Sequence, residues 1–338
     1  MAAGVYRGNG HTLQHRGHNG THRLSESGGT HSERGDHMLK STLRTLRDLP
    51  IINRPLSTAI KALVRDRPPE FVVRHLPRHG TVEIEVSDGK KVRFWSKGDD
   101  WITSRLWWLG LDGHEPEMNR PFQEFAKHAR TILDIGAYTG FYALLAVAVN
   151  PTARVFAFEP HPGIAARLGR NVSLNQANSV TILPYVVASE RSGLVEFHIG
   201  GPGLPSSSSR AEDWRGLHQS IWVAAIDIDS FCLEWGLEHV DLIKMDVEAM
   251  EPDVVRGMNR VLDANRPVVF SEVHPGGDDR YTSMYIDLQR RGYDAFRLVA
   301  DRCIRSVNLD FRSQDGTAVN YLFCPQEKIP SWLVISDD

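Results

Sequence analysis

The sequence has few cysteines, no long apolar run and no strong net charge. Its three cysteines, Cys232, Cys303 and Cys324, are far apart and match neither metal-ligand nor disulfide spacing. No run approaches the roughly 20 apolar residues that span a bilayer, and the N-terminus has no apolar signal-peptide core. The net charge of -3 gives no reason to expect nucleic acid as a partner. These absences favour a cytoplasmic protein that is neither exported nor integral to a membrane.

Aliphatic side chains are almost absent from the first 37 residues. This segment is rich in Gly, His, Ser, Thr and Arg, so it cannot bury enough apolar surface to offset the entropy cost of ordering. We therefore predict a disordered Gly/His-rich tail over residues 1–37.

Residues 38–125 predict an N-terminal cap of basic helices and a small β structure. Leucines recur at helical spacing among lysines and arginines over 39–67, with a break near Pro55. This basic amphipathic segment favours a helix that packs on the domain with a solvated basic face; the alternative is a peripheral contact with a membrane surface or an acidic partner. The alternating stretches FVVRHL, TVEIEV and KVRFW, over 71–95, predict a β-meander.

Strand and helix patterns alternate from residue 126 to residue 330. RTILDIG, RVFAFEP, VTILPYVV, VDLIKMD and RPVVFSEVH have the composition of buried strands, and the helical pattern FYALLAVAV follows the first of them. This alternation predicts a doubly wound α/β domain with a parallel sheet. AFRLVA and AVNYLFC have no helix between them and are expected to pair as a hairpin.

A glycine turn joins the first of these strands to its helix. Gly136 is followed next by Gly140, so the turn lacks the G-x-G-x-x-G pattern of dinucleotide sites. Glu159 ends the second strand, where an acid accepts the ribose hydroxyls of an adenosine. Asp134, at the end of the first strand, repels phosphate and suits an ammonium group. The pattern therefore favours an adenosyl sulfonium ligand, which has no pyrophosphate to seat.

A second set of charged residues follows two later strands. Lys244 and Asp246 share one strand face, Glu248 lies in the next turn, and Glu272 and His274 end the following strand. We expect the acids and His274 to converge beside the cofactor pocket. Three hypotheses stay open: Asp246 and Glu272 bind a divalent cation such as Mg²⁺, His274 is a general base, or Lys244 organises a structural salt-bridge network.

Four stretches resemble the FkbM-type family of S-adenosylmethionine-dependent methyltransferases: TILDIGAYTGFYALLA, VFAFEPHP, NVSLN and DLIKMDVEAMEPDVVRG. The resemblance covers roughly residues 100–275. It implies a Rossmann-like sheet of seven strands with the last strand antiparallel, and methyl transfer to a hydroxyl of a sugar, glycan or natural product.

The resemblance also implies roles for particular residues. Glu159 and Asp246 serve the cofactor together with the glycine turn, and Ala188 and Ser189 flank the adenine. The reaction site is lined by Lys244, Asp246, Glu248 and Glu272. The turn residues concerned are Gly136, Ala137, Tyr138 and Gly140. Two departures stand out, because the family usually has Asn in place of Tyr138 and Gly-Ala in place of Ala249-Met250, and Gly tolerates a positive φ that Ala does not.

Two other functions remain open from the sequence. One is a nicotinamide-dependent oxidoreductase or epimerase on the same fold, which the broken fingerprint and the lack of any Tyr-x-x-x-Lys pair weaken. The other is a non-catalytic module that binds an adenosyl ligand. We expect a small-molecule or glycan acceptor, and the sequence leaves association with a second copy of the chain open.

Overall fold

The computed structural model describes most of the chain beyond residue 46. The described ranges are 47–64, 68–199, 208–209, 219–273, 279–299, 302–306 and 319–337. All of them belong to one compact unit, Leu46–Asp338. The predicted tail 1–37 and the candidate base His274 lie outside the described residues.

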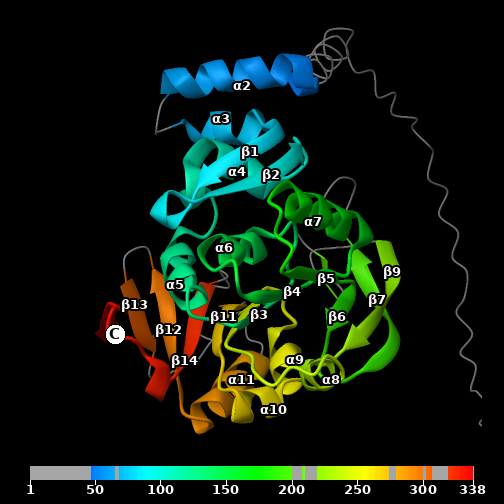
Figure 1. Ribbon diagram of the computed structural model, residues 1–338, viewed down its shortest axis with the longest axis vertical. Coiled ribbons are helices and arrows are strands. Elements are labelled where there is room, and N and C mark those ends of the chain that lie inside the picture. The colour runs from blue at the N-terminus through cyan, green and yellow to red at the C-terminus, as the bar shows by residue number, and fades with distance from the viewer. Residues whose placement is uncertain are drawn as a thin grey trace, which may run out of the picture. The chain divides into compact units, whose positions relative to one another are not determined.

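A large sheet forms the centre of this unit (Figure 1). Among the described residues it has nine strands, in the order β15-β13-β12-β14-β11-β10-β3-β4-β5. Their bounds are β3 Thr131–Ile135, β4 Arg154–Phe158, β5 Val180–Leu183, β10 Leu242–Met245, β11 Val268–Val273, β12 Tyr293–Val299, β13 Arg302–Ser306, β14 Val319–Pro325 and β15 Ile335–Asp337. The five strands from β11 to β5 are mutually parallel, whereas β14 is antiparallel to both β11 and β12.

The predicted doubly wound sheet of seven strands with an antiparallel last strand is therefore confirmed. It corresponds to β12, β14, β11, β10, β3, β4 and β5. AFRLVA and AVNYLFC pair as β12 and β14, but they do not form the expected hairpin, because β13 lies between them in the sequence. The sequence did not predict β13 and β15, which extend the sheet beyond β12.

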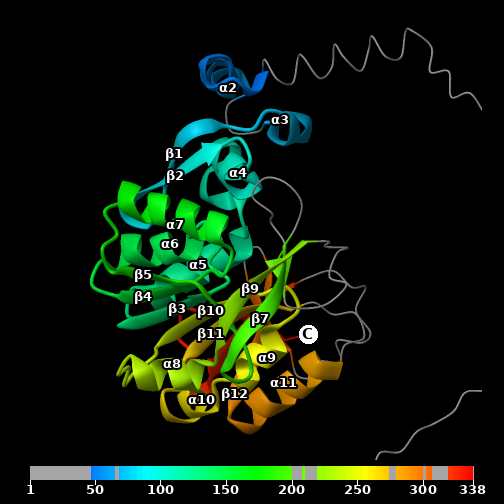
Figure 2. The ribbon, with the colours of Figure 1, turned by 90° about the vertical axis from the view of Figure 1, so that its right-hand side faces the viewer.

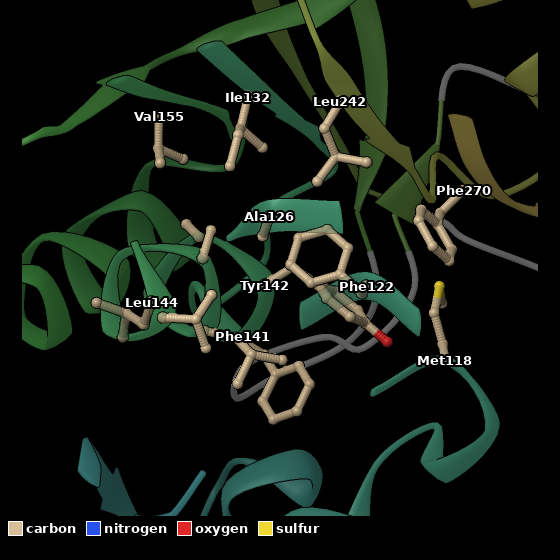
Figure 3. Close-up of a cluster of buried hydrophobic side chains, with 14 of the residues drawn as sticks. Met118, Phe122, Ala126, Ile132, Phe141, Tyr142, Leu144, Val155, Leu242 and Phe270 are labelled. Atoms are coloured by element: carbon tan, nitrogen blue, oxygen red, sulfur yellow. The ribbon is translucent and has the colours of Figure 1, made fainter. Parts of the chain in front are cut away.

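Helices cover both faces of the sheet, as Figure 2 shows. α5 (Pro116–Ala126), α6 (Phe141–Val149) and α7 (Pro162–Leu174) lie on one face; α8 (Ile228–Glu234), α9 (Glu251–Arg256), α10 (Asn259–Ala264) and α11 (Asp279–Arg290) lie on the other. Each face buries its own apolar cluster. On the first face the Phe122 ring packs edge-on against Tyr142 and Phe270, with centroids 4.8 Å and 5.7 Å away (Figure 3).

One predicted strand of the sheet domain is divided in the structure. VTILPYVV is two strands, because Pro184 has no N–H for a ladder, and β6 (Tyr185–Val187) joins a different sheet from β5. That second sheet has the order β6-β9-β7-β8, with β7 Ser192–Ile199, β8 Ser208–Ser209 and β9 Gln219–Ile226. The helical segment after β10 is also in two parts, since α9 ends at Arg256 and α10 begins at Asn259. A Cβ at Gly257, between the two helices, would lie 2.3 Å from the Ala188 carbonyl oxygen.

The N-terminal cap differs from its prediction in two places. FVVRHL belongs to helix α3 (Glu70–His75), not to a strand, so β1 (His79–Glu85) and β2 (Lys91–Lys97) form a hairpin without a third strand. The short apolar run fits either element by composition, but the Glu70–Arg74 ion pair at i,i+4 and burial of Val73 favour the helix. Helix α2 (Pro50–Val64) also runs through Pro55 without the predicted break.

Helix α4 (Trp101–Leu109) completes the cap and connects it to the sheet domain. The buried Asn171 side chain of α7 accepts from the Trp95 N–H of β2 and donates to the Thr139 carbonyl of the glycine turn, over 2.8 Å and 2.9 Å. Arg167 of α7 pairs with Asp99, just before α4, at 3.0 Å. The predicted domain boundary between residues 125 and 126 stays a prediction.

Candidate active site

The turn after β3 approaches the strand β10 closely enough to require glycine. Gly136 has φ +80°, and a Cβ there would lie 1.8 Å from the carbonyl oxygen of Asp246. Gly140 has φ +91°, and a Cβ there would lie 2.3 Å from the Leu168 side chain. The two glycines thus bring the turn against β10 on one side and α7 on the other.

The N–H groups of this turn are used inside the protein. Gly136 and Ala137 donate to the Phe158 carbonyl, over 3.1 Å and 2.9 Å, and Gly140 donates to Ala137 over 2.8 Å. The Tyr138 N–H donates to Oε2 of Glu159 over 3.0 Å. Four donors that a pyrophosphate would need therefore already have partners.

Glu159 lies at the end of β4 with its carboxylate fixed from both sides. His161 N–H donates to Oε1 over 2.8 Å while Tyr138 N–H holds Oε2, and the residue is only 5% exposed. Burial raises the pKa of Glu159 to about 8, although the two N–H donors oppose the shift. The carboxyl group therefore changes charge near neutral pH.

A pocket opens beside Glu159. Its walls come from the ends of β3, β4 and β10, from β6 and β7, and from Ile102 of α4. The lining includes Gly136, Tyr138, Phe158, Glu159, Tyr185, Val186, Val187, Phe197, Asp246, Val247, Glu248 and Met250. Most of these side chains are apolar, and the acids are at strand ends. Ile102 shows that the N-terminal cap contributes to this site.

Asp134 is not among the residues that line the pocket. It is 1% exposed, and its Oδ2 accepts from the Ala143 N–H in the first turn of α6, over 3.0 Å. It is also opposite Lys244 in the parallel β3–β10 register. Burial raises the pKa of Asp134 to about 6, against the lowering effect of Lys244. Its expected contact with a ligand ammonium stays a prediction.

Lys244 is a buried cation surrounded by acids. Its Nζ is 3.1 Å from Oδ2 of Asp246, and the residue is 3% exposed. Burial opposes its charge, but Asp246, Asp134 and Glu115 outweigh this effect and raise the pKa of Lys244. The salt-bridge network expected around Lys244 is therefore present.

Asp246 is shared between this network and the pocket. Burial acts to raise its pKa, but Lys244 and a side-chain hydrogen bond with Glu272 hold the pKa below the ordinary aspartate value. The register of β10 against β11 explains the second contact, because Met245 is opposite Ser271. The structure thus brings together Lys244, Asp246 and Glu272, as expected from their strand ends.

The turn after β10 is held in a left-handed conformation. Glu248 has φ +54° and Ala249 has φ +71°, and the buried Glu251 accepts the Val247 N–H over 2.8 Å. Tyr138, in the other turn, has φ +48°. Both departures from the family pattern therefore include a position with positive φ, where Gly or Asn is tolerated better than Ala or Tyr.

The sequence did not predict a group of polar residues near Lys244 that comes from α5 and β14. Glu115, at the start of α5 with φ +40°, accepts from the Tyr142 hydroxyl over 2.5 Å and from Asn320 Nδ2 over 3.2 Å. His114 Nε2 is 3.5 Å from Oε2 of Glu115, and a charge on His114 also lowers the pKa of Asp246. These polar residues come from segments about 200 residues apart in sequence, and no spacing pattern connects them.

The donor set around Asp246 does not fit the expected magnesium site. Among the described residues, no group of three or more His, Cys, Asp or Glu is arranged to hold a metal ion. The Lys244 ammonium occupies the cation position on Asp246, and Glu272 forms a side-chain hydrogen bond with Asp246. Ala188 and Ser189 follow β6 and are not among the residues that line the pocket, so their contact with adenine also stays a prediction.

The chain is similar in sequence to known methyltransferases. The chain is 33% identical over 149 residues to the 2-O-methyltransferase NoeI of Sinorhizobium fredii, an alignment that covers 40% of this chain and 60% of that protein. It is 28% identical to the hexuronic acid methyltransferase AglP of Haloferax volcanii, over 49% of this chain and 65% of AglP. The chain thus spans less than two thirds of either relative.

A solved structure titled methyltransferase FkbM, from Methylobacillus flagellatus KT, aligns with a TM-score of 0.38 and 16% identity, covering 67% of this chain and 55% of that one. Residues 134–295, which contain the glycine turn, Glu159 and the Lys244 network, match the model of the methyltransferase FkbM domain. This chain therefore carries a methyltransferase FkbM domain.

Proposed function

We propose that the protein is an S-adenosylmethionine-dependent O-methyltransferase that acts on a hydroxyl of a sugar, glycan or natural product. The observation that carries the proposal is the Glu159 carboxylate, held by two backbone N–H groups in the wall of a largely apolar pocket. Such a carboxylate accepts the two ribose hydroxyls of an adenosine.

The pocket fits this cofactor better than a dinucleotide. Gly136 leaves room where any Cβ would meet β10, and Val186 and Val187 supply apolar surface for an adenine. The turn donors at Gly136, Ala137 and Tyr138 are already bonded within the protein, so they are not available for a pyrophosphate. Asp246 and Glu248 line the same pocket and suit a sulfonium and an ammonium.

When bound, S-adenosylmethionine supplies a methyl group activated by its sulfonium charge. The residues of the chain would hold the acceptor hydroxyl in line with that methyl and take its proton. Asp246 is the group we propose for this contact, because it lines the pocket and its lowered pKa keeps it ionised at neutral pH. Lys244 would fix the orientation of the Asp246 carboxylate through the 3.1 Å contact.

The polar residues beyond Asp246 favour a hydroxylated acceptor. His114, Glu115 and Asn320 present hydrogen-bonding groups on that side of the Lys244 network. One relative is called a hexuronic acid methyltransferase, which supports a carbohydrate acceptor, and another a 2-O-methyltransferase, which supports transfer to oxygen.

A transfer assay with S-adenosylmethionine tritiated in the methyl group tests the reaction type. Acceptors are supplied in three panels that differ in nucleophile: polyols and sugars, amines, and thiols. We expect label in the first panel, and about a hundredfold loss of the rate in Asp246→Asn. Asp263→Asn, an exposed aspartate of α10, is the matched control. Label confined to amines or thiols would contradict O-methylation.

A further inference from the structure

Helix α2 is attached to the cap by its polar side. Asn53 and Ser57 are its buried residues. Asn53 Nδ2 donates to the Pro77 carbonyl over 2.7 Å, and its Oδ1 accepts from the His79 N–H over 3.0 Å. Ser57 Oγ accepts from Arg78 over 2.8 Å. The helix is therefore fixed by hydrogen bonds to β1 and the residues before it.

A second contact fixes the C-terminal half of α2 in the same orientation. The Lys61 ammonium donates to the Trp107 carbonyl and lies 4.3 Å from the centroid of the Trp107 ring. Ile60 and Val64 pack in a small cluster with Trp108 and Val73. Both halves of the helix thus present the same side to the cap.

The outer side of α2 is apolar along its whole length. Ile51 and Leu63 are 82% and 81% exposed, and Phe71 of the neighbouring helix α3 is 71% exposed. The exposed apolar residues of α2 are Ile51, Ile52, Pro55, Leu56, Ala59, Ala62 and Leu63, and the polar residues Arg54 and Thr58 are exposed beside them. Figures 1 and 2 both show α3 and α4 on one side of α2 and no other labelled element on the opposite side. This polarity is the reverse of a surface helix in a soluble domain.

The charge of this region matches an anionic surface. Residues 38–67 contain seven lysines and arginines against two aspartates; α2 itself has no acid, and because Lys61 is bound to Trp107 of the cap, Arg54 is its exposed basic residue. Asp48, one of the two aspartates, is already paired with Arg47. An apolar outer face with basic residues at its sides is the pattern of a helix that lies in a membrane interface.

A second copy of the chain fits the outer face less well. An antiparallel or parallel pair of α2 helices would bring the arginine and lysine of one copy near those of the other, which is unfavourable. A helix of 15 residues is also short, about 22 Å long, and one of its faces offers less than the roughly 800 Å² per partner of a standard interface.

We propose that α2 docks the protein on an anionic lipid bilayer, with Ile51, Leu56 and Leu63 inserted among the lipids and the basic side chains at the head groups. Phe71 of α3 adds to the inserted surface. This is peripheral contact: among the described residues, no helix is both long and apolar enough to cross a membrane.

Flotation of the full chain with lipid vesicles tests the proposal. One vesicle type is phosphatidylcholine alone, and the other contains about one third phosphatidylglycerol. We expect binding to the anionic vesicles, and release at about 0.5 M salt because screening weakens the contact with the head groups. Absence of binding to anionic vesicles would overturn the proposal.

Two double variants assign the binding to α2. Ile51→Ser with Leu63→Ser removes the most exposed apolar side chains of the helix and should lower the bound fraction at least about tenfold. Leu194→Ser with Leu233→Ser, at sites 67% and 69% exposed elsewhere, should bind as the wild type does. Equal binding of the α2 variant and the wild type would contradict the proposal, as would a dimer in sedimentation experiments that this variant abolishes. Titration with S-adenosylhomocysteine reports on the pocket separately and should be unchanged in both variants.

Discussion

The Tyr138 N–H donates a 3.0 Å hydrogen bond to Oε2 of Glu159, 21 residues further along the chain. This contact connects the turn after β3 to the end of β4, and His161 N–H fixes the other carboxylate oxygen. Glu159 is thus oriented before any ligand arrives, so ligand binding does not have to order its side chain. The predictions below begin from this group.

The stability of the protein should fall as the pH rises towards 8. Burial moves the pKa of Glu159 from an ordinary value near 4.5 to about 8, so the folded protein holds a proton that the unfolded chain releases. Because the native state binds more protons in this window, the free energy of unfolding decreases between about pH 4.5 and 8. Urea unfolding at several pH values measures this slope, which Glu159→Gln should reduce. An identical slope in the variant would show that Glu159 titrates normally.

Gly136→Ala should destabilise the protein far more than an ordinary glycine substitution. Its Cβ would meet the Asp246 carbonyl at 1.8 Å, in addition to the strain of φ +80°. We expect a loss above about 3 kcal/mol, or failure to fold. Gly236→Ala is the matched control, because Gly236 has φ +59° but nothing within 4 Å of an added Cβ. It should cost about 1 kcal/mol. Equal losses in urea unfolding would contradict the close approach of the turn to β10.

Ala249→Gly should stabilise the protein. Ala249 has φ +71°, which costs an alanine about 1 kcal/mol that glycine does not incur. Part of this gain is offset by the greater flexibility of glycine in the unfolded chain, so we expect up to about 0.5 kcal/mol in urea unfolding. The same change at the exposed Ala166 of α7 should instead lose about 1 kcal/mol. A destabilised Ala249→Gly protein would mean that the turn is not strained.

Lys244→Met should strongly destabilise the protein at neutral pH. The substitution leaves the buried Asp134 and the partly exposed Asp246 without their cation; breaking a fully buried pair from one side costs about 3–5 kcal/mol, and the exposure of Asp246 makes the expected loss smaller than that. Adding Asp246→Asn to the variant removes one uncompensated charge and should recover part of the loss. Urea unfolding of the single and double variants at pH 7 measures both effects. A double variant less stable than Lys244→Met would contradict the pairing.

The sequence was sufficient where periodicity and turn chemistry agreed. The strand over 131–135, its glycine turn and the helix over 141–149 were predicted almost to the residue, because a buried parallel strand and a buried helix both lack polar interruptions. Strand-end acids were also predictable. Glu159, Asp246 and Glu272 lie at neighbouring strand ends, and parallel strands bring their carboxyl ends to one edge of the sheet.

The sequence did not predict features that depend on contacts between distant segments of the chain. Apolar residues on one side of a surface helix normally face the core, which predicts that the apolar side of α2 points inward. In the structure, Asn53 and Ser57 form hydrogen bonds with Pro77 and Arg78 of the cap, so the polar side faces inward instead. Glu115 and Asn320 meet although they are 205 residues apart, and neither belongs to a recognisable motif. Such polar contacts depend on the sheet order, which brings β14 beside β11.

The most direct test of the account is calorimetric titration of the full chain with S-adenosylhomocysteine and, separately, with NADH. We predict binding of S-adenosylhomocysteine alone. At pH 9, above the pKa of about 8 at which Glu159 ionises, the affinity should fall about ten- to a hundredfold in Glu159→Gln, because hydrogen bonds to a charged acceptor contribute about 1.5–3 kcal/mol. The control Glu238→Gln, at an exposed site before β10, should bind as the wild type does. Binding of NADH but not S-adenosylhomocysteine would contradict the account, and so would an unchanged affinity in Glu159→Gln.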